Sequence, residues 1–181
     1  KQRQSGVLMH ISSLPGKYGI GSMGQAAYDF VDFLVRTKQR YWQILPLGTT
    51  SYGDSPYQSF SAFAGNTHFI DFDILVEKGW LQLEDLQGID FGQNPVEVDY
   101  AAIFQARRPL LEKVVANIKA QGLPAEYGIF LTENDFWIHT FAEYMAIKEH
   151  FDLKPWTDWE DQGARLRHHE TLEHYRHLLA D

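Results

Sequence analysis

Residues 51–66 carry a mixture of side chains that suits the binding of a sugar. Four aromatic residues (Tyr52, Tyr57, Phe60 and Phe63) are interleaved with serines, an aspartate, a glutamine and an asparagine. Aromatic rings suit the apolar faces of a pyranose, and short polar groups between them can hydrogen-bond its hydroxyls. An ordinary packed Ω-loop would tolerate the same residues, so composition alone leaves both interpretations open.

A strand–helix–strand pattern determines where these side chains face. Gly6–Ile11 is typical of a strand buried on both faces of a parallel sheet, residues 25–37 have an apolar helical stripe, and Tyr41–Leu45 is a second strand. A parallel pair joined by a helix places the loops over residues 12–24 and 48–66 at the same edge. Ligands bind at that edge in parallel α/β folds, which favours a ligand site over a packed loop.

The rest of the chain is predicted to be mostly helical. Residues 68–72 resemble a further strand, and residues 73–78 a short helix. Asp99 is expected to cap a helix over residues 100–121, with a kink or an interruption at Pro109. Further helices are predicted over residues 126–132, 136–150 and 160–181, the second of them capped by Asn134 or Asp135.

Other polar groups are less convincing as sites. Asp29 and Asp32 resemble paired general acids, but they lie off the apolar stripe of their helix and indicate its solvated face. His10 lies at the end of the first strand, where a histidine of the apolar core is the favoured interpretation. Its place at the rim of the sheet keeps it a candidate site residue. The last predicted helix carries four histidines, two of them at a spacing that can ligate a metal: His168, His169, His174 and His177. A solvated helix is favoured there, and no metal is predicted.

The composition excludes several classes of partner. The chain has 181 residues and a formal net charge of -8, so it has no basic surplus to neutralise nucleic-acid phosphates. It contains no cysteine, which excludes disulfides and thiolate zinc sites. No apolar run approaches the roughly 18 residues of a membrane span. A cytoplasmic protein with no membrane contact and no cofactor is the expected class.

The fold class follows from the order of the elements. Two or three parallel strands cannot close a barrel, which needs about 250 residues. An α/β opening followed by helices therefore predicts the first part of a longer chain with a helical insertion. Such a part has an open strand edge, so we expect low solubility when it is alone.

Three motifs resemble the bacterial 4-α-glucanotransferases, also called amylomaltases or disproportionating enzymes. The motifs are Ser12–Gly21 (SSLPGKYGIG), Tyr41–Leu47 (YWQILPL) and Tyr52–Asn66 (YGDSPYQSFSAFAGN). They have the order and spacing of the family, and the resemblance is strong over residues 5–79. One departure is the pair Thr67 and His68, where the family usually has a proline followed by an aromatic residue.

The resemblance implies a (β/α)8 TIM barrel with helical insertions. Residues 1–72 would be the first β-α-β part of the catalytic barrel, with a substrate loop over residues 48–66. Residues 73–181 would be a mostly helical insertion that leads back toward the barrel.

The activity implied is the transfer of an α-1,4-glucan segment to another glucan or to glucose, by a retaining double displacement that uses carboxylates. In the family these carboxylates lie on later barrel strands, so we expect no catalytic residue in this chain and no activity from it alone. The implied partners are maltooligosaccharides and the remainder of the barrel. A non-catalytic α-glucan-binding module is the alternative.

The resemblance also assigns roles within the substrate loop. Tyr57 matches a tyrosine that stacks on the sugar at the cleavage point, and Ser55 matches a serine that hydrogen-bonds sugar hydroxyls. Asp54 and Gln58 flank these residues, and each either contacts the ligand or holds the loop by its own hydrogen bonds. Tyr52 matches an aromatic residue that some members use in a second, surface glucan site.

Overall fold

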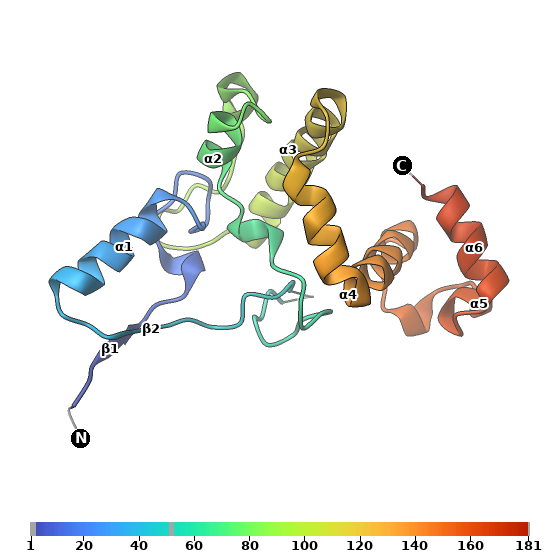
Figure 1. Ribbon diagram of the computed structural model, residues 1–181, viewed down its shortest axis with the longest axis horizontal. Coiled ribbons are helices and arrows are strands. Elements are labelled where there is room, and N and C mark those ends of the chain that lie inside the picture. The colour runs from blue at the N-terminus through green and yellow to red at the C-terminus, as the bar shows by residue number, and fades with distance from the viewer. Residues whose placement is uncertain (1–2, 51–52, 181) are drawn as a thin grey trace. The chain divides into compact units, whose positions relative to one another are not determined.

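The computed structural model describes residues 3–50 and 53–180, and Figure 1 shows the order of the elements along the chain. The chain forms two compact units, Lys1–Pro124 and Ala125–Asp181. The division predicted at residue 72 concerns the plan of a whole barrel, and it stays a prediction.

The first unit opens with the predicted β-α-β arrangement. Strands β1 (Gly6–Leu8) and β2 (Tyr41–Gln43) pair in parallel, with Val7 opposite Trp42, and helix α1 (Gln25–Arg36) connects them (Figure 1). Both strands are shorter than predicted. β1 was expected to be buried on both faces, but within the described residues Leu8 is 60% exposed. Within the described residues the sheet has two strands, which is too few to cover its faces.

The strand predicted over residues 68–72 is also wrong. A 3₁₀ turn, η2 (Thr67–Phe69), is followed by helix α2 (Phe72–Glu77). Side chains cap both elements: Asn66 accepts a hydrogen bond from the His68 amide, and Asp71 accepts one from the Ile74 amide. These local caps favour helical turns over a strand, although the segment has an apolar composition.

Helix α3 (Tyr100–Gln121) begins at its predicted cap, where Asp99 accepts a hydrogen bond of 2.9 Å from the Ala102 amide. The helix is continuous through Pro109, so no interruption occurs there. Its buried face includes Ile103 and Leu110, and each such side chain stabilises the fold by about 1.5–3 kcal/mol. Those contributions offset the free-energy cost of the backbone hydrogen bond that proline cannot donate.

Two apolar clusters hold the first unit together. One joins α2 to α3 through buried side chains that include Phe72, Leu75 and Leu110, with the 3₁₀ turn η3 (Leu83–Leu86) at its edge. The other lies behind the strand exits and includes Ile11, from the 3₁₀ turn η1 (Ile11–Ser13), and Phe69. The second cluster therefore joins the loops that follow the two strands.

The second unit is helical, and its boundaries differ from those predicted. One helix, α4 (Ala125–His150), replaces the two predicted helices. The Asn134 side chain bonds within the helix, donating to the Phe130 carbonyl and accepting from the Trp137 indole, so it does not cap a new segment.

The final helix predicted over residues 160–181 is also divided. A 3₁₀ turn, η4 (Trp156–Asp158), precedes α5 (Gln162–Arg165) and α6 (His169–Leu178). Asp161 caps α5, and Arg167 reverses the chain after it with a φ of 56°. The charged composition of the segment did not reveal this reversal.

Candidate functional site

The loop over residues 48–66 leaves the carboxyl end of β2 and closes on itself (Figure 1). Gly48 and Gly65 form an antiparallel bridge, and the Asn66 amide donates a 2.8 Å hydrogen bond to the Leu47 carbonyl. The two ends of the loop therefore meet, and the loop projects from a fixed base. This is the edge at which the strand order predicted a ligand site.

His10 links this base to the end of β1. Its Nδ1 accepts a 3.3 Å hydrogen bond from the Leu45 amide, and its ring meets the edge of Phe69. Burial lowers the pKa of His10, so the imidazole is neutral at pH 7 and can act as this acceptor. These contacts fit the interpretation of His10 as a core histidine.

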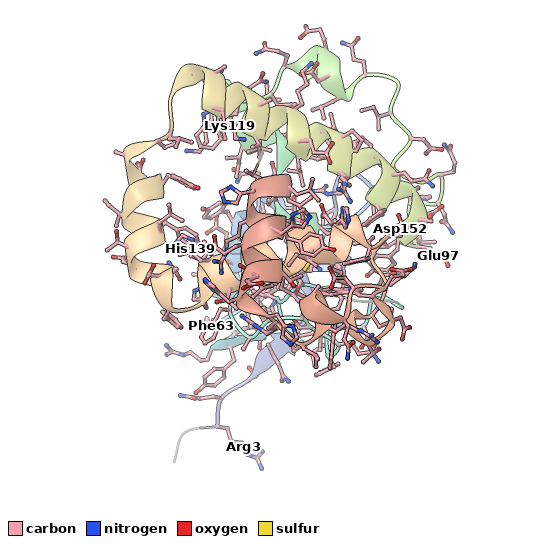
Figure 2. The ribbon with its side chains drawn as sticks, turned by 90° about the vertical axis from the view of Figure 1, so that its right-hand side faces the viewer. Arg3, Phe63, Glu97, Lys119, His139 and Asp152 are labelled. Carbon is pink, nitrogen blue, oxygen red and sulfur yellow. The ribbon has the colours of Figure 1, made fainter. Side chains whose placement is uncertain are left out.

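Serine side chains determine the shape of the loop. Ser59 Oγ donates to the Ser61 carbonyl at 2.7 Å, and Ser61 Oγ accepts from the amides of Phe63 and Ala64 at 3.1 Å. Local bonds of this kind hold a turn in one conformation. Two of the aromatic rings lie on the outside: Phe63 is 60% exposed and is labelled in Figure 2, and Tyr57 is 73% exposed.

Ser55 organises the part of the loop that contains the predicted sugar-binding residues. Its carbonyl accepts a 3.0 Å hydrogen bond from the Gln58 amide, and its Oγ lies 3.4 Å from the Tyr57 amide nitrogen. The turn therefore brings Ser55, Tyr57 and Gln58 together. Contact of any of them with a glucan remains a prediction.

Asp54 lies beside this turn in a left-handed conformation, with a φ of 53°. Burial raises the pKa of its carboxyl group, and its charge contributes to the raised pKa of Tyr100, whose main cause is burial. Asp54 therefore lies near the start of α3. Tyr52, the remaining predicted site residue, lies outside the described residues.

The motif over residues 12–21 lines a wide hollow of about 930 Å³, with residues 88–98 on its other side. Two of its glycines lie where a side chain has no room: a Cβ on Gly19 would lie 2.0 Å from the Phe91 carbonyl oxygen, and one on Gly21 would lie 2.0 Å from that of Ile11. Tyr18 donates to Asp73 at 2.5 Å and holds the motif against α2. Sequence reasoning identified the motif, but it did not assign residues 88–98 to the same hollow.

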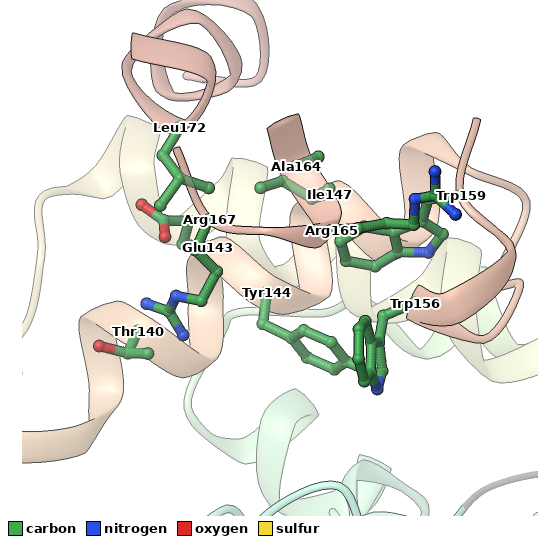
Figure 3. A pocket seen from close by; sticks show the side chains of 10 residues that line it. All are labelled: Thr140, Glu143, Tyr144, Ile147, Trp156, Trp159, Ala164, Arg165, Arg167 and Leu172. Atoms are coloured by element: carbon green, nitrogen blue, oxygen red, sulfur yellow. The ribbon is translucent and has the colours of Figure 1, made fainter. Parts of the chain in front are cut away.

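The second unit has its own smaller pocket, of about 250 Å³ (Figure 3). Its walls include Tyr144, Trp156 and Trp159, and Glu143 and Arg165 are among its polar groups. Trp156 is half exposed and Trp159 is buried. No pattern in the sequence indicated that α4 and α5 would complete a pocket with these two tryptophans.

Residues 3–50 and 53–180 offer neither a cluster of metal ligands nor a membrane-spanning helix. No three or more His, Cys, Asp or Glu side chains of this part come together in a way that could hold a metal ion. The histidines of α6, including His174 and His177, are exposed. None of the helices described is both long and apolar enough to span a bilayer.

His68 is a half-buried residue to which sequence reasoning assigned no role. Its Nδ1 has no hydrogen-bond partner within the described residues. Burial and the nearby charge of Arg107 lower its pKa from 6.5 to about 4. The folded protein therefore holds a neutral imidazole immediately after the loop.

We expect this histidine to make stability depend on pH. Between pH 6.5 and about 4 the unfolded chain binds a proton that folded His68 does not, so the free energy of unfolding falls as the pH is lowered through this range. Urea unfolding at about pH 5 and about pH 7 measures the difference. His68→Phe should show a smaller loss on acidification, whereas His177→Phe, at an exposed position, should behave as the wild type. Equal losses in wild type and His68→Phe would contradict the prediction.

Comparison with known proteins agrees with the motifs. The model of the family described as 4-alpha-glucanotransferase matches residues 9–181. A 4-alpha-glucanotransferase of Streptococcus pneumoniae is 68% identical over 181 residues, which are 100% of this chain and 36% of that protein. One from Thermus thermophilus is 40% identical, over 99% of this chain and 35% of that protein.

Among solved structures, the amylomaltase from Streptococcus agalactiae in complex with acarbose matches with a TM-score of 0.93 and 55% identity. The match covers 99% of this chain and 36% of that one, so the chain spans about a third of the length of these relatives. The predicted fold class, the first part of a TIM barrel with a mostly helical insertion, is confirmed.

Proposed function

This chain belongs to the 4-alpha-glucanotransferase family, and we propose that it is the substrate-holding amino-terminal portion of an enzyme that transfers α-1,4-glucan segments. The acceptor is another glucan or glucose. The reaction proceeds through a covalent glycosyl-enzyme, which requires a carboxylate nucleophile and a second carboxyl group that serves first as acid and then as base. We place these carboxylates on barrel strands outside this chain.

The observation that carries the proposal is the loop over residues 48–66, in which exposed aromatic rings stand on a base fixed by backbone hydrogen bonds. We assign Tyr57 to stacking on the sugar at the cleavage point. The face of its ring covers the apolar C–H groups of a pyranose, and its negative potential favours the positive charge that develops in an oxocarbenium-like transition state.

Polar groups beside the ring supply hydrogen bonds to the sugar hydroxyls. Ser55 is assigned to this role, with Asp54 and Gln58 on either side of it. Tyr52 is assigned to a second surface glucan site. The preformed turn supports the assignments of Ser55, Tyr57 and Gln58, because little order must be gained when a glucan binds.

We propose that the whole protein is organised around the TIM barrel. Residues 1–72 form its first β-α-β part, and residues 73–181 form a helical insertion that leads back to it. We propose maltooligosaccharides as substrates and a cytoplasmic location. For the substrate, acarbose is the ligand named for the streptococcal amylomaltase structure. For the location, two plant relatives are described as chloroplastic/amyloplastic.

Incubation of the full-length protein with maltotriose tests this function. We expect glucose and longer maltooligosaccharides among the products, and none from the 181-residue chain alone. Absence of products from the full-length protein, together with measurable maltotriose binding, would favour the glucan-binding module. Disproportionation by the chain alone would contradict our placement of the catalytic groups.

A further inference from the structure

Arg107 occupies a position on α3 that normally holds an apolar residue. It is 1% exposed and lies on the same buried face as Ile103 and Leu110. Burial lowers its pKa to about 10, so the side chain still carries a positive charge at neutral pH. A buried cation needs specific partners, because burial removes the stabilising effect of water.

The partners of Arg107 belong to the turn that follows the substrate loop. Its Nη2 donates a 2.5 Å hydrogen bond to the Ile70 carbonyl and lies 3.5 Å from the Thr67 carbonyl oxygen. Its guanidinium carbon is 4.3 Å from the centre of the Phe72 ring. Nε and Nη1 have no hydrogen-bond partner within the described residues. The contacts observed thus join α3 to the turn over residues 67–70.

The same turn is also held by the end of the loop over residues 12–24. The Met23 amide donates to the Phe69 carbonyl at 2.9 Å, and Ser22 Oγ donates to an Asp71 carboxylate oxygen at 2.5 Å. Residues 67–71 are therefore fixed between two elements that are distant in sequence.

Residue 66, immediately before this turn, pairs with Leu47 and closes the base of the loop. A shift of the turn would consequently move the base that carries Tyr57. A displaced or less ordered loop binds a sugar less well, because it must regain its order when the sugar binds.

We propose that Arg107 is a positioning residue for the glucan-binding loop over residues 48–66, acting through the carbonyl oxygens of Thr67 and Ile70. This inference rests on the proposed glucanotransferase function. The buried charge thereby has a role in sugar binding in addition to its packing. Arginine suits this position, because its planar cation can face an aromatic ring and donate hydrogen bonds to backbone carbonyls at its edge.

Arg107→Met in the full-length protein tests the proposal. We expect KM for maltotriose to rise roughly 10-fold, with a smaller change in kcat for the folded fraction, since the loop would bind the sugar less well. A role confined to folding would lower the active fraction and leave KM unchanged. Arg108→Met is the matched control, because Arg108 is the next residue and pairs with Glu112 on the same helix; its KM should equal that of the wild type.

Two further measurements keep the proposal falsifiable. In the absence of glucan, hydrogen exchange at residues 53–66 should be faster in Arg107→Met than in the wild type. This measurement tests the positioning role of Arg107 even if the wild type shows no transfer activity. Added guanidinium should restore KM in Arg107→Ala, since the free ion can occupy the vacated site. If Arg107→Met does not fold, the same measurements on Arg107→Lys decide. Wild-type KM and wild-type exchange in a folded variant would overturn the proposal.

Discussion

Replacement of Tyr57 by alanine in the full-length protein is expected to lower kcat/KM for maltotriose by roughly 10- to 1000-fold, equivalent to about 1.4–4 kcal/mol at the transition state. The side chain is 73% exposed, so the free protein gains little from its packing, and its removal should leave the fold intact. The loss would come from the sugar, which no longer has an aromatic face to stack on. Initial rates of glucose release, measured over a range of maltotriose concentrations, provide the test.

Two variants separate stacking from other effects of the Tyr57 substitution. Tyr57→Phe keeps the ring and should retain most of the activity if stacking is the main contribution. Tyr28→Ala removes a tyrosine that is 66% exposed on α1, outside the substrate loop, and should leave kcat/KM unchanged. Near wild-type kinetics for Tyr57→Ala would remove Tyr57 from the proposed site.

The elements that could be predicted from the sequence are those determined by local signals. Helix α3 was predictable because Asp99 provides a cap and apolar residues recur at helical spacing after it. Residues 68–72 were misassigned because an apolar run does not distinguish a strand from a capped turn followed by a helix. Asn134 was expected to cap a helix because asparagine often does so. In the structure its side chain instead forms hydrogen bonds within α4.

The candidate site was predictable in part. The composition of residues 51–66 and the direction of the parallel strands indicated a ligand loop, and the fold places that loop at the expected edge. Arg107 could not be found in the same way, because a charged residue within an amphipathic helix normally indicates its solvated side. The partners that explain its burial, the carbonyls of Thr67 and Ile70, are brought to it by the tertiary fold.

Phe72→Ala is expected to lower the free energy of unfolding by about 3–5 kcal/mol, a large part of the roughly 5–15 kcal/mol available to a typical domain. Phe72 is 0% exposed, and its ring meets those of Tyr18 and Phe91 and the guanidinium of Arg107. The substitution leaves a cavity between α2 and α3 and removes the ring that faces the buried cation. Urea unfolding, followed by circular dichroism, measures the change.

Phe63→Ala is the control for this measurement, because the ring of Phe63 is 60% exposed and its loss should change the free energy of unfolding by no more than about 0.5 kcal/mol. A double-mutant cycle with Arg107→Met then tests whether the two residues act together. Since the ring and the guanidinium are in contact, the double variant should lose less stability than the sum of the single losses. Strict additivity would mean that the contact contributes nothing to stability, and it would limit Arg107 to its backbone hydrogen bonds.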